Sequence, residues 1–255
     1  MSHLIHIAYA LPFLMMVCAC GGGAEAKDKP HWGYQGEHGP EHWAEMDPKF
    51  SACASGSAQS PINIVTSDAI AEDLPELVCA YGTAPLAIVH NGHAIQVNLP
   101  AGNLLQVGPD EYALKQFHFH GPSEHVLDGV HSPMEMHLVH AAADGNLAVV
   151  GVMIREGAEN AALKAAWESL PSERGGALEP AGVEVDVAAL LPNDRGYYHY
   201  IGSLTTPPCS EGVTWFVLRT PIELSKGQID SFRAIIPANN RPLEPLNGRI
   251  VKSSQ

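Results

Sequence analysis

The sequence predicts a mainly β fold built as one large domain, and three observations indicate it. Short runs of alternating apolar and polar residues recur along the chain, and Gly, Pro, Asn or Asp separates most of them. Helical periodicity is found in only two segments. The 255 residues, 45% of them hydrophobic, can bury a sizeable core, and all-β domains of this length occur as single units. We therefore expect a mainly antiparallel sheet.

The expected elements follow from these patterns. Strands are predicted at residues 86–90, 94–99, 104–107, 113–120, 135–140, 147–154 and 213–219. A first helix is predicted over residues 161–170, before Pro171. A second helix is predicted over 225–235, where Ser225 stands three residues before Gln228 in a capping-box pattern. Both helices are expected to pack against the sheet and to carry no chemistry.

The segment 33–60 is rich in Gly, Pro, His and Ser and has no sustained periodicity. This composition indicates an extended arm laid over the domain rather than a separate module. His31, His38 and His42 lie in or next to this segment. We expect them to be surface residues, because nothing rigid fixes their spacing.

Residues 1–26 are predicted to be a leader, followed by one domain over 27–255. The short apolar run at 11–17, with small residues after it, is typical of a secretory signal rather than a membrane-spanning helix. Cleavage after Ala26 fits the small-residue pattern, whereas Cys20, before three glycines, resembles the end of a bacterial lipoprotein signal. We favour the second alternative, in which Cys20 carries a lipid anchor. Either alternative predicts an exported protein of the periplasm or cell envelope.

Acidic residues outnumber basic ones, with 28 Asp and Glu against 14 Lys and Arg and a net charge of −14. A surface this acidic repels phosphate backbones, which argues against a nucleic-acid partner. The expected partner is a small-molecule substrate, and a homodimer is left open.

Three histidines form a pattern that is typical of a metal site. Residues two apart in a strand share a face, so His118 and His120 point together. Turn residues separate this run from the next one, so an antiparallel return brings His137 to the same face. Three nitrogen ligands with one open position are the arrangement of a catalytic zinc site. Gln116 and Glu135 each stand two residues before a ligand, where they can accept the other N–H of its ring.

Further motifs extend this pattern over nearly the whole chain after the leader. The motifs are His31-Trp-Gly-Tyr34, Ser60-Pro-Ile-Asn63, Asn91-Gly-His93, Gln116-Phe-His-Phe-His120, Ser123-Glu-His125, Glu135-Met-His-Leu-Val-His140, Gly202-Ser-Leu-Thr-Thr-Pro-Pro208 and Asn239-Asn-Arg-Pro242. Together they resemble the α-class carbonic anhydrases. The resemblance implies one domain with a central, twisted, mostly antiparallel sheet and short peripheral helices. It departs from many members at Gly121-Pro122, where they carry a tryptophan and a longer turn.

The resemblance also implies a Zn²⁺ cofactor and the reversible hydration of carbon dioxide to bicarbonate and a proton. Thr205 would orient the zinc-bound hydroxide and donate to Glu124, a buried carboxylate. His93 would be the proton shuttle, and the Asn239 carbonyl would accept from His120. Val139 stands two residues after His137 and therefore faces the metal side of the same strand, where it is expected to line the substrate pocket. The resemblance assigns Val149, Leu204 and Trp215 to this pocket, with Thr206 as a polar contact for product or inhibitor. It assigns Tyr34, Asn91 and Gln96 to a water network, and His125 and Tyr200 to a structural pair.

Three cysteines remain beyond the leader, at Cys53, Cys79 and Cys209. An exported chain meets an oxidising compartment, so pairing is expected, but an odd number leaves one over. The resemblance implies a disulfide between Cys53 and Cys209, with Cys79 unpaired. The alternative is that Cys53 and Cys209 are free buried thiols.

Two other functions are open. A catalytically silent family member would serve as a binding or adhesion domain, and such members typically lose a ligand histidine. An exported metal-binding or buffering protein would fit the 14 histidines and the acidic charge. Such a protein would bind several zinc ions per chain rather than one.

Overall fold

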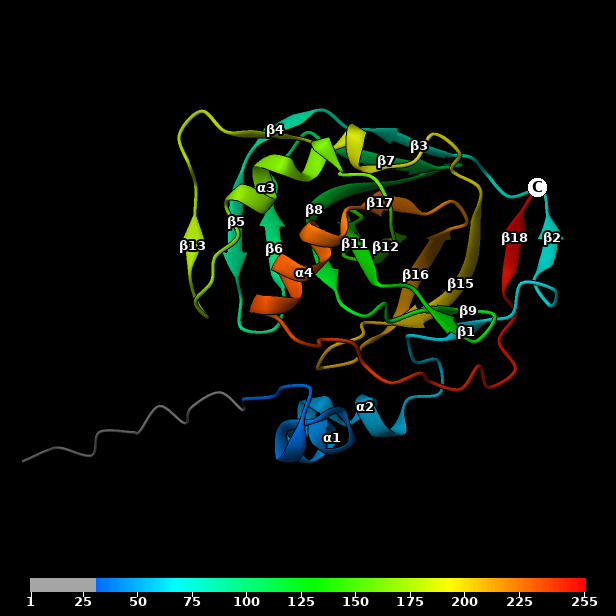
Figure 1. Cartoon of the computed structure of the whole chain (residues 1–255). Coiled ribbons are helices and arrows are strands. Elements are labelled where there is room, and N and C mark those ends of the chain that lie inside the picture. The colour runs from blue at the N-terminus through cyan, green and yellow to red at the C-terminus, as the bar shows by residue number, and fades with distance from the viewer. Residues whose placement is uncertain (1–30) are drawn as a thin grey trace, which may run out of the picture.

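One large sheet organises the part of the chain that this computed structural model describes, residues 31–255 (Figure 1). Residues 1–30 lie outside the described part, so the leader, both cleavage sites and Cys20 stay predictions. Between residues 31 and 255, no helix is both long enough and apolar enough to cross a membrane.

The large sheet has 13 strands and is mixed, with mostly antiparallel neighbours. Its strands are β2 (Ile70–Glu72), β3 (Leu77–Ala80), β5 (Ala87–His90), β6 (Ile95–Asn98), β7 (Leu104–Val107), β8 (Asp110–His120), β11 (Met134–Ala141), β12 (Leu147–Glu156), β13 (Ala177–Leu178), β15 (Tyr197–Ser203), β16 (Glu211–Leu218), β17 (Ile222–Leu224) and β18 (Lys252–Ser254). The main path runs β13-β5-β6-β8-β11-β12-β16-β15-β18-β2, while β17 pairs with β12, and β7 pairs with both β8 and β3. Parallel pairing occurs where β12 meets β16 and β17 and where β18 meets β2. The predicted fold class is confirmed.

The predicted strands are all present, with small shifts at their ends. The sequence does not predict β15, because its residues do not alternate between apolar and polar and its exposed position is the apolar Ile201. Most of the other unpredicted strands have only two or three residues, too few to show a period. They include the members of two small sheets, β1 (Asn63–Ile64) with β9 (Val126–Leu127) and β10 (Val130–His131), and β4 (Thr83–Pro85) with β14 (Glu184–Asp186).

Two helical segments pack on one face of the sheet (Figure 1). The predicted helix 161–170 is instead a 3-10 turn at Ala161–Leu163 followed by α3 (Lys164–Glu168), and it ends before Leu170. The second prediction is confirmed by α4 (Lys226–Ile235), which begins after the expected capping box. In that box the Ser225 hydroxyl accepts from the Gln228 N–H at 3.2 Å, and the Gln228 side chain accepts from the Ser225 N–H at 3.1 Å.

The phenylalanines of β8 point toward these helices. Phe117 and Phe119 are fully buried, and the Phe119 ring centroid lies 4.9 Å from that of Trp167 in α3 and 6.3 Å from that of Phe232 in α4. Because side chains alternate along a strand, the residues between them emerge on the opposite face. The apolar core on the helical side therefore fixes which face of β8 carries the histidines.

The expectation of an extended arm over residues 33–60 is wrong. The segment folds into short turns, with 3-10 helices at Gly36–His38, Pro40–His42 and Pro48–Phe50 and the α-helices α1 (Trp43–Met46) and α2 (Ala52–Ser55). Trp43 explains the compact form, because it is fully buried and its indole N–H donates to the carbonyls of Gly33, at 2.8 Å, and His38, at 3.1 Å. One buried aromatic residue thus holds the segment in a compact form, although its sequence shows no hydrophobic periodicity.

Candidate metal centre

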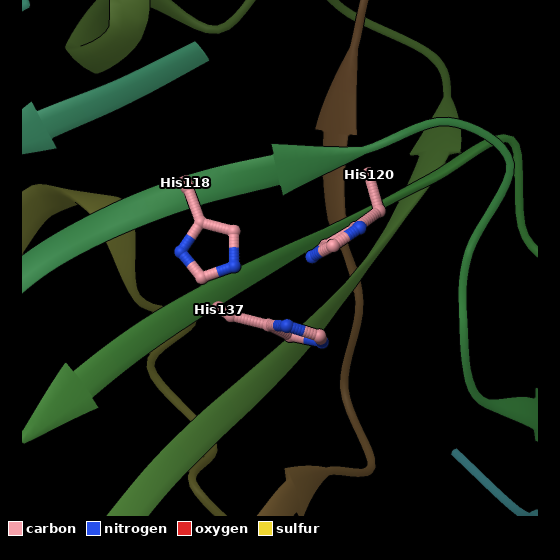
Figure 2. Close-up of side chains that lie close together, drawn as sticks. All are labelled: His118, His120 and His137. Carbon is pink, nitrogen blue, oxygen red and sulfur yellow. The ribbon is translucent and has the colours of Figure 1, made fainter. Parts of the chain in front are cut away.

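Three histidines from two adjacent strands converge on one point. His118 and His120 lie on β8 and His137 lies on β11, where it is paired directly with His118 in the antiparallel register. One ring nitrogen of each histidine lies within 4.8 Å of the corresponding nitrogens of the other two. Figure 2 shows the three rings turned toward a common centre. The predicted ligand set is therefore assembled by strand periodicity together with the β8–β11 register.

In all three rings, the nitrogen away from this centre is hydrogen-bonded to an oxygen of the protein. The bonds are His118 Nδ1 to Gln116 Oε1 at 2.8 Å, His120 Nδ1 to the Asn239 carbonyl at 2.7 Å and His137 Nε2 to Glu135 Oε1 at 2.9 Å. A ring that donates from one nitrogen presents a lone pair at the other. Two Nε2 atoms and one Nδ1 atom are thus left as acceptors, which is the state that a metal ligand needs.

Burial keeps the three imidazoles neutral. It lowers the pKa of His118 well below its ordinary value, with further depression from the neighbouring His120 and His137. It lowers the pKa of His120 to about 4, and it lowers that of His137 against the opposing effect of Glu135. Since only the neutral ring can coordinate a metal, the site is in its ligating form at neutral pH.

The Glu135 carboxylate connects one ligand to a second buried histidine. Its Oε1 accepts from His137 Nε2 at 2.9 Å and from His125 Nδ1 at 2.8 Å, and its Oε2 accepts from the backbone N–H groups of Glu124 and His125. Burial alone would raise the pKa of Glu135, but the facing His125 and His137 hold it well below its ordinary value. His125 Nε2 lies 2.6 Å from the Tyr200 hydroxyl. This chain of bonds orients His137 from the side away from the centre.

A second buried carboxylate, Glu124, lies close to two of the ring nitrogens that face the centre. Glu124 Oε1 accepts from the Arg241 backbone N–H at 2.9 Å, while Oε2 lies 3.6 Å from His120 Nε2 and 3.9 Å from His137 Nδ1. Burial raises the pKa of Glu124 to about 7, opposed by His137, the Arg241 N–H and the Thr205 hydroxyl. Among the described residues, His120 Nε2 and Glu124 Oε2 are both buried without a hydrogen-bond partner. A lone pair buried without a donor is a feature that a bound cation would satisfy, so the donor set fits zinc.

The comparison with known proteins agrees with this geometry. The family described as eukaryotic-type carbonic anhydrase matches residues 38–255 of the chain. The chain belongs to this family.

Relatives of known sequence and structure cover nearly the same region. The carbonic anhydrase of Pectobacterium atrosepticum is 44% identical over 93% of this chain and 96% of that protein, and human carbonic anhydrase 7 is 39% identical over 88% and 97%. The structure of the α-carbonic anhydrase from Thermovibrio ammonificans with the inhibitor sulfanilamide aligns with a TM-score of 0.85 at 43% identity, over 89% of this chain and 99% of that one. These matches show a carbonic anhydrase with the fold of the family.

The residues expected to form the substrate pocket gather beside the metal centre. Val139 of β11 is paired with Val149 of β12, which is paired in turn with Trp215 of β16. Val149 and Trp215 are buried, and Val139 and Leu204 pack against the same cluster. Thr205 is buried and Thr206 is partly buried in the loop after β15. The wall of this carbonic anhydrase beside His137 is therefore apolar, since the Trp215 ring lies 4.9 Å from that of His137 between centroids.

The residues expected to move protons or to hold the connecting waters lie in the N-terminal segment and in or next to the β5–β6 turn. The side-chain carbonyl of Asn91 accepts from the His93 N–H at 2.9 Å, and its amide donates to Gln96 at 3.2 Å. The His93 ring is stacked on Trp32 with centroids 3.5 Å apart, and its pKa falls to about 4 because of burial, Arg174 and neighbouring histidines. The Tyr34 hydroxyl is buried without a partner among residues 31–255. In this position His93 is neutral at pH 7 and is a weak base.

A disulfide joins Cys53 in α2 to Cys209, close to the threonine loop, as the resemblance implies. The Cys209 N–H donates to the Thr206 carbonyl at 2.9 Å. Cys79 is free and partly buried. The bond therefore ties the N-terminal segment to the loop that carries Thr205.

Sequence reasoning assigned no role to Arg241, although the motif that contains it was noted. The side chain is buried and donates to Gln59 Oε1 and the Ser60 carbonyl at 2.8 Å and to the Cys53 carbonyl at 3.0 Å. Its backbone N–H holds Glu124. A buried arginine between an asparagine and a proline gives no periodic signal, so only its position in a shared motif could have indicated its importance.

Proposed function

We propose that this carbonic anhydrase binds one zinc ion through His118, His120 and His137 and uses it to hydrate carbon dioxide reversibly to bicarbonate and a proton. The convergence of three neutral imidazoles, each oriented by a bond on its far side, carries this proposal. When bound, zinc supplies hydroxide near neutral pH by lowering the pKa of water to about 7, a value measured in carbonic anhydrase itself.

Thr205 is proposed to orient the nucleophile. In its ionised form Glu124 can only accept hydrogen bonds, so it draws the Thr205 hydroxyl hydrogen toward itself and leaves the threonine lone pairs free. The Thr205 hydroxyl opposes the rise that burial causes in the pKa of Glu124, which is consistent with this direction of donation. The apolar wall of Val139, Val149 and Trp215 then offers a dry space suited to a small apolar molecule rather than to a peptide.

His93 is proposed to carry the proton away, because a relay group near the site has to exchange protons with buffer at neutral pH. Its stacked position on Trp32 does not suit this task, since burial and Arg174 lower its pKa to about 4. Proton transfer therefore needs the His93 ring to leave the stack for a more solvated position. Tyr34, Asn91 and Gln96 are proposed to hold the waters that connect this ring to the metal centre.

The test is stopped-flow hydration of carbon dioxide by the mature domain, with and without zinc chelation, together with a metal count. Rapid, chelator-sensitive hydration with one zinc per chain is the expected result. One bound zinc without hydration would favour a binding domain, and several zinc ions per chain without hydration would favour a metal-buffering protein.

The substitution Thr205→Val is expected to lower kcat/KM for carbon dioxide by about 10²-fold, because it removes the hydroxyl while keeping the shape of the side chain. Thr205→Ser is the matched control and should retain most of the activity. The zinc content should stay at one per chain in both variants. An unchanged kcat/KM in Thr205→Val would contradict the orienting role.

The substitution Val149→Tyr is expected to reduce turnover by at least about tenfold, because the larger side chain would occupy the space proposed for the substrate. Zinc should remain bound, because Val149 takes no part in the hydrogen bonds that orient the three histidine rings. Val149→Ala, which enlarges the same space, is the control. Normal turnover in a folded Val149→Tyr variant would contradict the proposal that Val149 lines the substrate pocket.

We also propose that the chain is exported to the periplasm or cell envelope. The disulfide supports this location, because such bonds persist in oxidising compartments. Mass spectrometry of the mature N-terminus separates the two signals. A lipid-modified Cys20 supports the anchored form, whereas an unmodified chain that begins near Lys27 supports simple secretion.

A further inference from the structure

A pocket of about 390 Å³ opens beside His93. Its polar lining consists mainly of the histidines His31, His38, His90 and His93 with Arg174. The His31 ring centroid lies 6.1 Å from that of His93 and 5.9 Å from that of His38. These residues come from the N-terminal segment, the β5–β6 turn and the α3–β13 loop, so only the folded chain brings them together.

Arg174 supplies a cationic group that the protein does not neutralise. In a chain of net charge −14, its guanidinium forms no ion pair with any carboxylate among residues 31–255. Its Nη1 and Nη2 atoms lie 2.6 and 3.0 Å from the two ring nitrogens of His31. A neutral imidazole has one acceptor nitrogen, so at most one of these contacts is a hydrogen bond. Most of the N–H groups of Arg174 therefore have no acceptor there.

The histidines around Arg174 add donors rather than competing charges. His90 is buried and its Nδ1 accepts from the Gly92 N–H at 3.2 Å, which places the ring hydrogen on Nε2 as a donor. Burial, and after it the guanidinium, lowers the pKa of both His90 and His93, so these rings are neutral at pH 7. The pocket is thus lined by one permanent cation and by no carboxylate, and its other polar side chains include Tyr34, Gln35 and Asn239.

We propose that this pocket binds a small oxyanion, with Arg174 as its main anchor and His90 as a further donor. A planar guanidinium fork matches two oxygens of a phosphate or carbonate group, and the pocket is large enough for either ion. The bound ion would lie beside His93.

This position gives the ion a use that rests on the proposed shuttle role of His93. A proton on the His93 ring passes to bound hydrogen phosphate, which leaves as dihydrogen phosphate and returns the ring to its neutral form. An anionic buffer would thereby reach the pocket beside His93, although the overall negative charge of the chain repels it.

The test uses zinc-loaded mature enzyme titrated with inorganic phosphate at constant ionic strength, against chloride as the reference. The ring resonances of His90 and His93 are followed by NMR. Saturable shifts are expected in the wild type. The substitution Arg174→Ala should weaken phosphate binding at least about tenfold, because hydrogen bonds to a charged group are lost. Arg174→Lys should be intermediate, because it keeps the charge without the fork. Arg219→Ala, which removes an exposed arginine that does not line the pocket, should match the wild type.

Equal saturation in Arg174→Ala and the wild type, or no saturation at all, would overturn the proposal. A parallel titration with bicarbonate shows which oxyanions the pocket accepts. Saturation by phosphate alone supports a site for a phosphate buffer, and saturation by both ions supports a general oxyanion site. The NMR readout does not depend on turnover. Phosphate binding without carbon dioxide hydration would support this site and refute the proposed function. Hydration without saturable phosphate binding would support the proposed function and refute this site.

Discussion

Replacing His120 by alanine is expected to abolish carbon dioxide hydration, with a loss on the order of 10³-fold or more. His120 Nε2 is buried without a hydrogen-bond partner among the described residues and faces the centre where the other two ligand rings meet. Removing it leaves two nitrogen ligands, too few for a stable zinc site. The zinc content after dialysis and the stopped-flow rate, measured on the same sample, check this expectation.

The matched control is His42→Ala, because His42 is an exposed histidine that lies far from the site in sequence and has only a weak contact, 3.4 Å from Glu45. Its zinc content and rate should equal those of the wild type. Circular dichroism of both variants verifies that each is folded. A folded His120→Ala variant that retains one zinc per chain and hydrates carbon dioxide would refute the three-histidine site.

Removal of the disulfide through Cys53→Ser with Cys209→Ser is expected to lower the free energy of unfolding by up to about 5 kcal/mol. The bond joins two residues 156 positions apart in the sequence, and closing such a long loop strongly restricts the unfolded chain in the chain-entropy model. The native contacts around the bond, such as the Gln59 side chain donating to the Cys209 carbonyl at 3.0 Å, survive the substitution. The loss is therefore expected in stability more than in the rate of the folded enzyme.

Urea unfolding of the double variant, compared with oxidised and reduced wild type, measures this effect. Reduced wild type should match the double variant, and Cys79→Ser, which removes the free cysteine, should stay within about 1 kcal/mol of the wild type. Identical midpoints for the oxidised wild type and the double variant would show that the bond contributes nothing to stability.

The sequence alone predicted the parts of this protein that depend on local periodicity. Strands of period two placed His118 and His120 on one face and their phenylalanine neighbours on the other, and the structure has this arrangement. The capping box of Ser225 marked the start of α4 for the same reason, because all its atoms lie within one turn of chain. A pattern that repeats every two or four residues is set by backbone geometry, which is the same in every fold.

Tertiary structure decided the features that depend on contacts between distant segments. The His120 ring is oriented by donating to the carbonyl of Asn239, 119 residues away, and Glu135 accepts from His125 as well as from the histidine two residues after it. The compact N-terminal segment depends on one buried tryptophan. The stacking of the His93 ring on Trp32 is a second contact between distant segments, and the sequence around His93 does not predict it. The pocket around Arg174 likewise combines four separate parts of the chain. Periodicity cannot show such contacts, because burial and charge at a site are set by whichever segments pack there.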